Sequence, residues 1–370
     1  MDEAPVERLG RGSVVGLLTS GGDAPGMNAA LRTAVKLALS RGLTVLGIEA
    51  GYRGLIDGRA RPLGTADVED IHRRGGTVLG SARALDFLEA DGQRRAAGSV
   101  LALGLDALLV IGGNGSLTGA RVAARFPTRR GTPLRVVGLP ASIDNDIGHT
   151  SPAIGVDTAL NTIVEAADRI ADTAASHNRV FIIEVMGREC GYLAMASAIA
   201  CGADAVLFRE SGKSEEEVVD QIAGVVKDAF ARKPPKPRVL VVKSEGVKVS
   251  MERLQRLCDA RLLQGGLPTE TRGVVLGHLV RGGAPSAQDR LMAGRLGRAA
   301  MWAAIDGATD VMVGWQPQAG SRWVSAKDRA CQVVPLEEVL RETRALLDGS
   351  SPVMQWRVKA LSEVEDLMHF

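Results

Sequence analysis

The chain has 370 residues, of which 45% are hydrophobic, and its 45 basic and 43 acidic residues give a net charge of +2. This length is typical of two or three domains with sizeable cores. Aromatic residues make up only 3% of the chain and the basic residues form no tract, which argues against a base-stacking nucleic-acid platform or a membrane-binding arm. Scattered arginines remain compatible with small phosphorylated ligands.

The cysteines give no sign of a metal or disulfide framework. Cys190, Cys201, Cys258 and Cys331 lie far apart, without a CxxC or Cys/His cluster. Reduced thiols in the cytosol are the simplest interpretation. The N-terminus is polar and lacks a signal sequence, and no apolar run is long enough to span a membrane. We therefore expect a soluble, cytoplasmic protein.

Predicted strands and helices alternate along the chain. The expected strands are 13–19, 43–49, 107–111, 134–138, 180–185, 205–208, 239–242, 274–276 and 311–313. The expected helices are 29–40, 66–74, one ending near 126, 157–176, one ending near 199, 215–231, 251–263, 286–305 and two more at the C-terminus. A proline-rich connector is expected at 233–237. This alternation is typical of α/β proteins, in which parallel sheets carry helices on both faces.

Three loops are rich in glycine, at 20–28, 75–83 and 112–119. Glycine lets backbone N–H groups approach phosphate oxygens, and a following helix N-terminus favours negative charge. None of the loops is a Walker A motif or a dinucleotide fingerprint. One such loop can be an ordinary tight turn, but three in one chain favour a polyphosphate ligand.

A pair of carboxylates follows the predicted strand 134–138. Pro140 ends that strand, and Ser142, Asp144 and Asp146 come directly after it. Loops at strand C-termini hold the ligands of open α/β sheets. A carboxylate there can take a proton from a substrate hydroxyl or hold a metal ion. The pattern alone also fits a turn in which Asp and Asn cap their own backbone.

Further polar residues follow other predicted strands. Arg188 and Arg281 lie in glycine-flanked loops just after strands, a position suited to bidentate binding of a sugar phosphate. His278 and Glu245 lie at strand ends, where each could contact a ligand or serve the local fold. A polyphosphate donor, a phosphorylated acceptor and an aspartate are the parts that phosphoryl transfer needs, together with Mg²⁺.

Five separated motifs resemble those of the 6-phosphofructokinase family. They are Thr19 to Asn28, the Gly-Gly-x-Gly-Ser loop at 112, Ser142 to Asp146, Glu184 to Arg188, and Gly277-His278 with Arg281 to Gly283. The resemblance runs from about residue 14 to residue 315 in the family's motif order. It implies two Rossmann-like three-layer α/β domains with mostly parallel sheets, the phosphofructokinase fold. A nucleotide domain (1–155 plus 280–335) and a fructose 6-phosphate domain (156–279 plus 336–370) are expected.

The resemblance also implies roles for individual residues. The family transfers a phosphate of ATP or pyrophosphate to the 1-hydroxyl of fructose 6-phosphate, a step of glycolysis, and Asp144 matches its general base. The implied catalytic residues are Asp144, Ser142, Asp146, Arg188 and Arg83. The implied nucleotide-binding residues are Gly22, Tyr52, Arg83, Gly113, Asn114, Gly115, Ser116 and Gly119. The implied sugar-phosphate-binding residues are Ser142, Asp144, Arg179, Met186, Gly187, Arg188, Glu245, Arg272, His278 and Arg281. Because Arg179 and Arg272 match arginines that serve a neighbouring subunit, a homotetramer is expected.

The phosphate donor can be argued from two positions. Members that use pyrophosphate carry Asp and Lys where this chain has Gly115 and Ala141. Gly115 leaves room for the α-phosphate of ATP, and Ala141 supplies no charge to a shorter donor. We therefore expect ATP as the co-substrate, with a pyrophosphate-dependent enzyme as the alternative.

Asn114 departs from the family pattern, which has a magnesium-binding aspartate there. An amide oxygen can still coordinate Mg²⁺, but it binds hard cations less well than a carboxylate. Asn114 and Asp146 are the expected metal ligands. We expect an active ATP-dependent enzyme, with a catalytically impaired, sugar-phosphate-binding regulatory subunit as the alternative.

Overall fold

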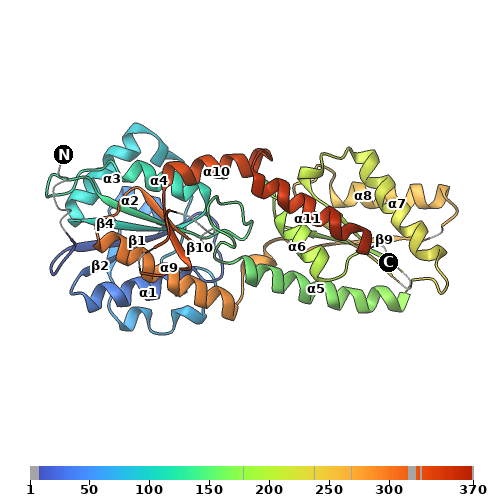
Figure 1. Ribbon diagram of the computed structural model, residues 1–370, viewed down its shortest axis with the longest axis horizontal. Helices are drawn as coiled ribbons and strands as arrows, with labels where there is room; N and C mark the ends of the chain where they lie inside the picture. The colour runs from blue at the N-terminus through green and yellow to red at the C-terminus, as the bar shows by residue number, and fades with distance from the viewer. Residues whose placement is uncertain are drawn as a thin grey trace. The chain divides into compact units, whose positions relative to one another are not determined.

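The computed structural model describes residues 8–177, 179–236, 238–267, 269–315, 322–325 and 327–368. The chain folds into two compact units and crosses between them several times (Figure 1). Unit 1 comprises Met1–Ile143, Ile147–Asp157 and Arg281–Arg344. Unit 2 comprises Asp144–Asp146, Thr158–Val280 and Ala345–Phe370.

Unit 1 is built on a seven-stranded sheet. Its strands are β1 (Val14–Ser20), β2 (Thr44–Ile48), β3 (Ala60–Pro62), β4 (Ala107–Gly112), β5 (Arg135–Pro140), β10 (Val311–Trp315) and β11 (Cys331–Pro335). They lie in the order β11-β10-β5-β4-β1-β2-β3. The inner pairs are parallel, and the two edge strands, β3 and β11, pair antiparallel with their neighbours. Every residue of β4 is buried, as expected for a strand covered on both faces.

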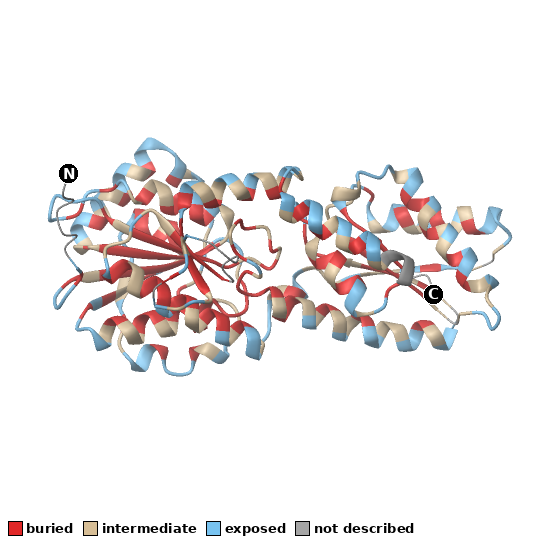
Figure 2. Cartoon of the chain, viewed as in Figure 1, coloured by how far each residue is buried: buried red, intermediate tan, exposed pale blue. Residues whose placement is uncertain are grey.

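Helices cover both faces of this sheet. They are α1 (Met27–Ser40), α2 (Gly51–Asp57), α3 (Ala90–Leu103), α4 (Asn114–Ala123), α9 (Ala287–Ile305) and α10 (Leu336–Asp348), which continues into unit 2. Short 3₁₀ helices occupy η1 (Ala66–Val68), η2 (Ile71–Arg73) and η3 (Leu85–Leu88). Helices α1 and α9 pack side by side on one face, with α2, α3 and α4 on the other (Figure 1). The strands between them are buried along most of their length (Figure 2).

Unit 2 is built on a four-stranded, all-parallel sheet. Its strands are β6 (Val180–Val185), β7 (Ala205–Leu207), β8 (Val239–Ser244) and β9 (Thr271–Val275), in the order β7-β8-β6-β9. Its helices are α5 (Val156–His177), which begins in unit 1, α6 (Tyr192–Ala200), α7 (Glu215–Ala231), α8 (Met251–Gln264) and α11 (Pro352–Met368). Its 3₁₀ turns are η4 (Arg209–Ser211) and η5 (Gly277–Arg281), whose last residue belongs to unit 1. Ile182 and Val241 pack against α7 and α8 in one hydrophobic core.

The expected alternation of strands and helices is confirmed, and most predicted ends lie within two residues of the observed ones. The structure corrects several details. Helix α2 lies between the expected strand 43–49 and the expected helix 66–74, where no element was predicted, and the helix expected at 66–74 is the pair η1 and η2. Strand β8 extends through Ser244. Strand β9 begins at Thr271 and ends at Val275, and His278 and Arg281 lie beyond it in η5. Both antiparallel edge strands were missed. Pro237 of the expected connector lies outside the described residues.

None of the helices in the described ranges is long and apolar enough to cross a membrane.

Candidate active site

The carboxyl edge of the unit 1 sheet contains a topological switch point. From β1 the chain continues to β2 on one side, whereas β4 and β5 lie on the other side. The loops after β1 and β4 therefore lead away in opposite directions, and ligands of open α/β sheets bind at such points. The first and third glycine-rich loops follow these two strands. The structure thus brings them to adjacent positions on one edge.

The second glycine-rich loop is fixed to the first by side-chain hydroxyls. Thr19 Oγ1 lies 2.6 Å from Thr77 Oγ1 and donates to the Gly80 carbonyl at 3.0 Å. Ser81 Oγ donates to the Gly21 carbonyl at 2.6 Å. These bonds hold the 75–83 loop beside the carboxyl end of β1, although no strand leads directly into it.

Asn28, which sequence analysis placed only at the end of a motif, also fixes this loop. Its side chain is fully buried at the start of α1. The amide nitrogen donates to the Arg74 carbonyl at 3.0 Å, and the amide oxygen accepts from the Val78 N–H at 2.9 Å. Asn28 therefore clamps the loop from both sides. Its place directly after a glycine-rich loop was the only sequence signal.

The third loop depends on close main-chain packing. A Cβ added at Gly112 would lie 2.4 Å from the Ser20 carbonyl oxygen, so any side chain there would force the main chain to shift. The Gly112 carbonyl accepts from the Ala141 N–H at 3.0 Å, so this loop also adjoins the segment after β5. Helix α4 begins at Asn114, and its N-terminal N–H groups suit an anion. Asn114 is half-buried and Gly115 is exposed.

Tyr52 lies beneath this helix and is almost fully buried. Its hydroxyl donates to the Ser116 carbonyl at 2.6 Å, and its ring stacks on Phe87 with centroids 4.2 Å apart. A Cβ at Gly119 would lie 2.6 Å from the Tyr52 ring, so that glycine makes room for it. Burial raises the pKa of Tyr52 well above its ordinary value. Tyr52 therefore supports the first turns of α4 as a neutral packing side chain.

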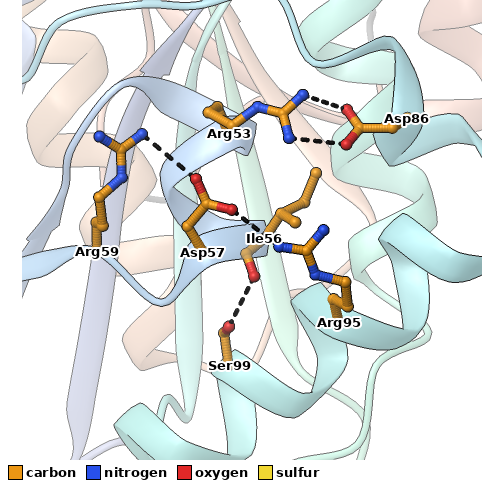
Figure 3. A network of polar contacts seen from close by, with 7 residues as sticks. All are labelled: Arg53, Ile56, Asp57, Arg59, Asp86, Arg95 and Ser99. Carbon is orange, nitrogen blue, oxygen red and sulfur yellow. Dashed lines mark hydrogen bonds and ion pairs between the residues drawn. The ribbon is translucent and has the colours of Figure 1, made fainter.

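Arg83 is exposed at the end of the second glycine-rich loop. The chain directly after it is fixed by Asp86 in η3, which makes a two-pronged ion pair with Arg53 of α2 at 2.7 and 2.6 Å (Figure 3). Figure 3 also shows Asp57 of α2 paired with Arg59 and Arg95. These contacts anchor the chain after Arg83 to α2, while the Arg83 side chain faces solvent.

Arg281, predicted to bind the sugar phosphate, packs against the first loop within unit 1. Its Nη1 atom donates to the Asp23 carbonyl at 3.4 Å, and a Cβ at Gly22 would lie 2.5 Å from the same atom. Nearby, a Cβ at Gly75 would lie 2.2 Å from the Gly283 carbonyl oxygen. The Arg281–Gly283 segment therefore closes against both the first and second glycine-rich loops.

The segment with the two carboxylates starts in unit 1 and enters unit 2. Ser142 N–H donates to the Ile154 carbonyl at 3.2 Å, and Ile154 N–H donates to Pro140 at 3.1 Å. Asp144 and Asp146 are half-buried, whereas Asn145 between them is fully buried. Asn145 has a left-handed backbone with φ of 52°, a conformation that Asn tolerates better than most residues.

The carboxyl edge of the unit 2 sheet brings together the predicted residues of two loops. The Glu245 N–H donates to Val185 at 2.9 Å, and Ser244 Oγ donates to the Gly187 carbonyl at 2.5 Å. Gly187 has φ of 120°, which disfavours any side chain there. Met186 is buried and Arg188 is exposed beside the half-buried Glu245. The Met186–Arg188 loop and Glu245 are therefore neighbours.

A buried ion pair that sequence analysis missed lies beneath these two loops. Lys243 is 1% exposed, and its Nζ atom lies 2.6 Å from Glu184 Oε2 and 3.3 Å from the Ser244 carbonyl. The Glu184 carbonyl accepts from the Leu276 N–H at 3.0 Å, which links β6 to the chain leading to the exposed His278. The expected strand 239–242 ended just before Lys243, which lies within β8. A buried lysine on a strand gave no recognisable signal.

Arg179 and Arg272 lie apart from these residues within unit 2. Arg179 precedes β6, and Arg272 is the second residue of β9, so both lie toward the amino ends of the strands. Strand β6 spans 6 residues, or about 20 Å at ~3.3 Å per residue, and so separates this end from the Met186–Arg188 loop. Arg179 lines a pocket of about 940 Å³ together with His177, Lys236 and Glu270.

The residues predicted to hold a metal ion come from different units, Asn114 from unit 1 and Asp146 from unit 2. Across the described part of the chain, no three His, Cys, Asp or Glu side chains cluster as a metal site. The chemistry of the pair still fits Mg²⁺, which prefers carboxylate and amide oxygens and keeps part of its water shell.

Fold and site together define a two-unit α/β protein with glycine-rich loops, of a kind suited to phosphate groups, on one sheet edge and an arginine and glutamate set on another. The sequence profile of the family described as Phosphofructokinase matches residues 14–304. The chain belongs to that family.

Curated relatives match most of this chain. "ATP-dependent 6-phosphofructokinase 2" of Bacteroides thetaiotaomicron is 42% identical over 307 residues, which cover 83% of this chain and 90% of that protein. "ATP-dependent 6-phosphofructokinase 1" of Thermus thermophilus is 44% identical over 300 residues, covering 81% and 88%.

Solved structures agree in fold. Phosphofructokinase from Saccharomyces cerevisiae superposes with a TM-score of 0.81 at 30% identity, covering 94% of this chain. This chain spans 50% of that longer yeast chain. The pyrophosphate-dependent phosphofructokinase of Marinobacter aquaeolei shares the fold with a TM-score of 0.75 at 21% identity.

Proposed function

We propose that this protein is an ATP-dependent 6-phosphofructokinase, which converts fructose 6-phosphate and ATP to fructose 1,6-bisphosphate and ADP. The observation that carries this proposal is the segment from Ser142 to Asp146. It keeps two carboxylates directly after β5, the strand next to the glycine-rich loop of β4. The curated relatives that match more than four fifths of the chain carry the same activity in their names.

The two units divide the substrates between them in this proposal. Unit 1 binds ATP through the loops after β1 and β4 and through Arg83, and unit 2 binds the sugar phosphate through Arg188 and Glu245. The proposed boundaries are 1–155 plus 280–335 for the nucleotide and 156–279 plus 336–370 for fructose 6-phosphate. The position of Arg281 against Asp23 suggests that this arginine also serves the nucleotide side.

In the reaction, the 1-hydroxyl oxygen of the sugar attacks the γ-phosphorus of ATP, and the bond from that phosphorus to the bridging oxygen breaks. Asp144 takes the hydroxyl proton, and ADP leaves with the bonding electrons. Arg83 offsets negative charge on the phosphoryl group as it moves. Asn114 and Asp146 would hold Mg²⁺, which supplies further charge neutralisation at the phosphates.

The choice of ATP over pyrophosphate rests on two neighbouring positions. Gly115 is exposed, and a Cβ there would meet no atom within 4 Å, which leaves space beyond the start of α4 for a longer donor. Ala141 is fully buried and uncharged. A shorter donor would be better served by a cation at that position.

We also propose a cytoplasmic homotetramer. Arg179 and Arg272 lie far from Arg188 and Glu245 along the strands of unit 2, so within one subunit they do not join the same site. Their support for the proposal is that an arginine pair at the opposite sheet edge can serve the sugar phosphate of an adjacent subunit.

The test is a product assay for fructose 1,6-bisphosphate, with ATP and pyrophosphate compared at several Mg²⁺ concentrations. We expect turnover with ATP and little with pyrophosphate. Equal or better turnover with pyrophosphate would overturn the donor assignment. Tight binding of fructose 6-phosphate without turnover from either donor would instead identify a regulatory subunit.

A further inference from the structure

Arg357 of helix α11 is a buried cation that contacts the segment carrying the two aspartates. Arg357 is only 7% exposed. Its Nη1 atom donates to the Asn145 carbonyl at 2.9 Å. Its guanidinium also lies over the Tyr192 ring at the start of α6, 4.6 Å from the ring centroid. All three residues belong to unit 2.

The surroundings of Arg357 explain how a charge can be buried there. Arg357, Asp146 and Glu210 all act electrostatically on the thiol of Cys190, so each lies within electrostatic range of that thiol. Cys190 is only 1% exposed, and this burial raises the pKa of its thiol to about 12. Burying a cation is costly unless it is paired and hydrogen-bonded, and here it has a carbonyl, an aromatic face and nearby carboxylates.

The hydrogen bond from Arg357 is made to the residue that lies between the two carboxylates, so it bears on the orientation of both. Asn145 lies between Asp144 and Asp146, is fully buried and has a left-handed backbone. Left-handed residues persist only where the surrounding structure holds them. A donor fixed to the Asn145 carbonyl sets the orientation of the peptide plane that joins Asn145 to Asp146, and limits how far the chain can turn on either side.

We propose that Arg357 is a positioning residue, which holds the Asp144–Asp146 backbone in the orientation needed for proton removal. This inference rests on the proposed kinase function of the same site. Arg357 lies outside residues 14–304 that match the family profile. Its helix would therefore supply a support for the catalytic segment from the C-terminal part of the chain.

Arginine suits this position better than lysine. A planar guanidinium can stack on an aromatic ring and donate from its edge at the same time, whereas an ammonium is a compact point charge. Lysine at position 357 could keep the charge but could not make both contacts with the same geometry. Arg357→Lys should therefore retain part of the function and Arg357→Met much less.

The experiment compares full-length Arg357→Met and Arg357→Lys with wild type, and uses Lys359→Met on the exposed side of the same helix as the matched control. We expect kcat to fall about 10- to 100-fold in Arg357→Met, because small displacements of catalytic groups have effects of this size. KM for fructose 6-phosphate should change less than about threefold, because the substitution disturbs the group that takes the proton and not the contacts that bind the substrate. The kcat of Arg357→Lys should lie between those of wild type and Arg357→Met.

A second measurement does not depend on activity. Hydrogen exchange of the peptide that covers 142–149 should be faster in Arg357→Met, with the melting temperature close to that of Lys359→Met. Unchanged exchange in this peptide would overturn the positioning role, whether or not the wild type turns over. A fall in kcat matched by an equal loss of folded protein would also overturn it. Wild type without turnover would reject the kinase function alone.

Discussion

The carboxyl edges of the two sheets achieve order by different means. On the unit 1 edge, the loops are joined by hydroxyls, one buried amide and main-chain packing around glycines such as Gly112. On the unit 2 edge, a hydroxyl bond from Ser244 to Gly187 also joins the loops, but a buried ion pair between Lys243 and Glu184 lies beneath them. The first arrangement leaves backbone N–H groups accessible for a polyphosphate, and the second places charged side chains around a smaller ligand. Substitutions that act on each edge separately can test this contrast.

The largest stability effect is expected at the ion pair. Lys243→Met leaves Glu184, whose side chain is 18% exposed, without its cation. Removing one partner of a buried pair costs ~3–5 kcal/mol, and partial exposure of Glu184 places the expected loss near the lower limit, about 3 kcal/mol. Urea denaturation should show a lower midpoint with an unchanged slope.

Two further variants make this test specific. In Lys243→Met/Glu184→Gln no unpaired charge is left, so most of the lost stability should return. Lys248→Met makes the same change at an exposed position a few residues further on and should have little effect. A single variant at Lys243 as stable as the one at Lys248 would show that the pair does not support this edge.

A smaller effect is expected from a single methyl group on the unit 1 edge. Gly112→Ala places a Cβ 2.4 Å from the Ser20 carbonyl, and the backbone must shift to accept it. Overpacking of this kind costs ~1–3 kcal/mol, so we expect a loss of about 2 kcal/mol and a higher KM for ATP. Stability is measured by denaturation, and KM for ATP by the fructose 1,6-bisphosphate product assay.

Gly98→Ala is the matched control for this substitution. Gly98 is exposed in α3, and an added Cβ would meet no atom within 4 Å. Alanine in a helix interior is favoured over glycine by ~1 kcal/mol, so this variant should be as stable as wild type or more so. If both alanine variants behaved alike, close main-chain packing at Gly112 would not be what orders the loop.

The contrast between the edges also explains what could be predicted from sequence. Glycine-rich loops and strand-end carboxylates form local patterns, so the alternating fold and the segment around Asp144 could be predicted. The burial of Lys243 could not be predicted, because a lysine after an apolar run is usually taken to end the strand. Only its partner Glu184, 59 residues away in sequence, makes its burial possible. Arg357 carries no local signal, since its contact lies 212 residues away in sequence. Such pairings are set by tertiary packing, which periodicity does not reveal.

The smallest expected effect concerns Asn114, the first residue of α4 and half-buried beside the third loop. Asn114→Asp adds a carboxylate at a helix N-terminus, where negative charge is stabilised by ~0.3–1 kcal/mol, and gives Mg²⁺ a stronger ligand than an amide. We expect the Mg²⁺ concentration for half-maximal rate to fall several-fold and kcat to rise modestly. Thr118→Asp, which adds the same charge to an exposed position one turn further along α4, is the control for a general charge effect. If both variants shift the Mg²⁺ dependence equally, the charge acts at a distance and Asn114 is not a ligand. If neither shifts it, the metal is held without the side chains of this loop. The loop would then act on the phosphates through its main chain, as the packing on the unit 1 edge suggests.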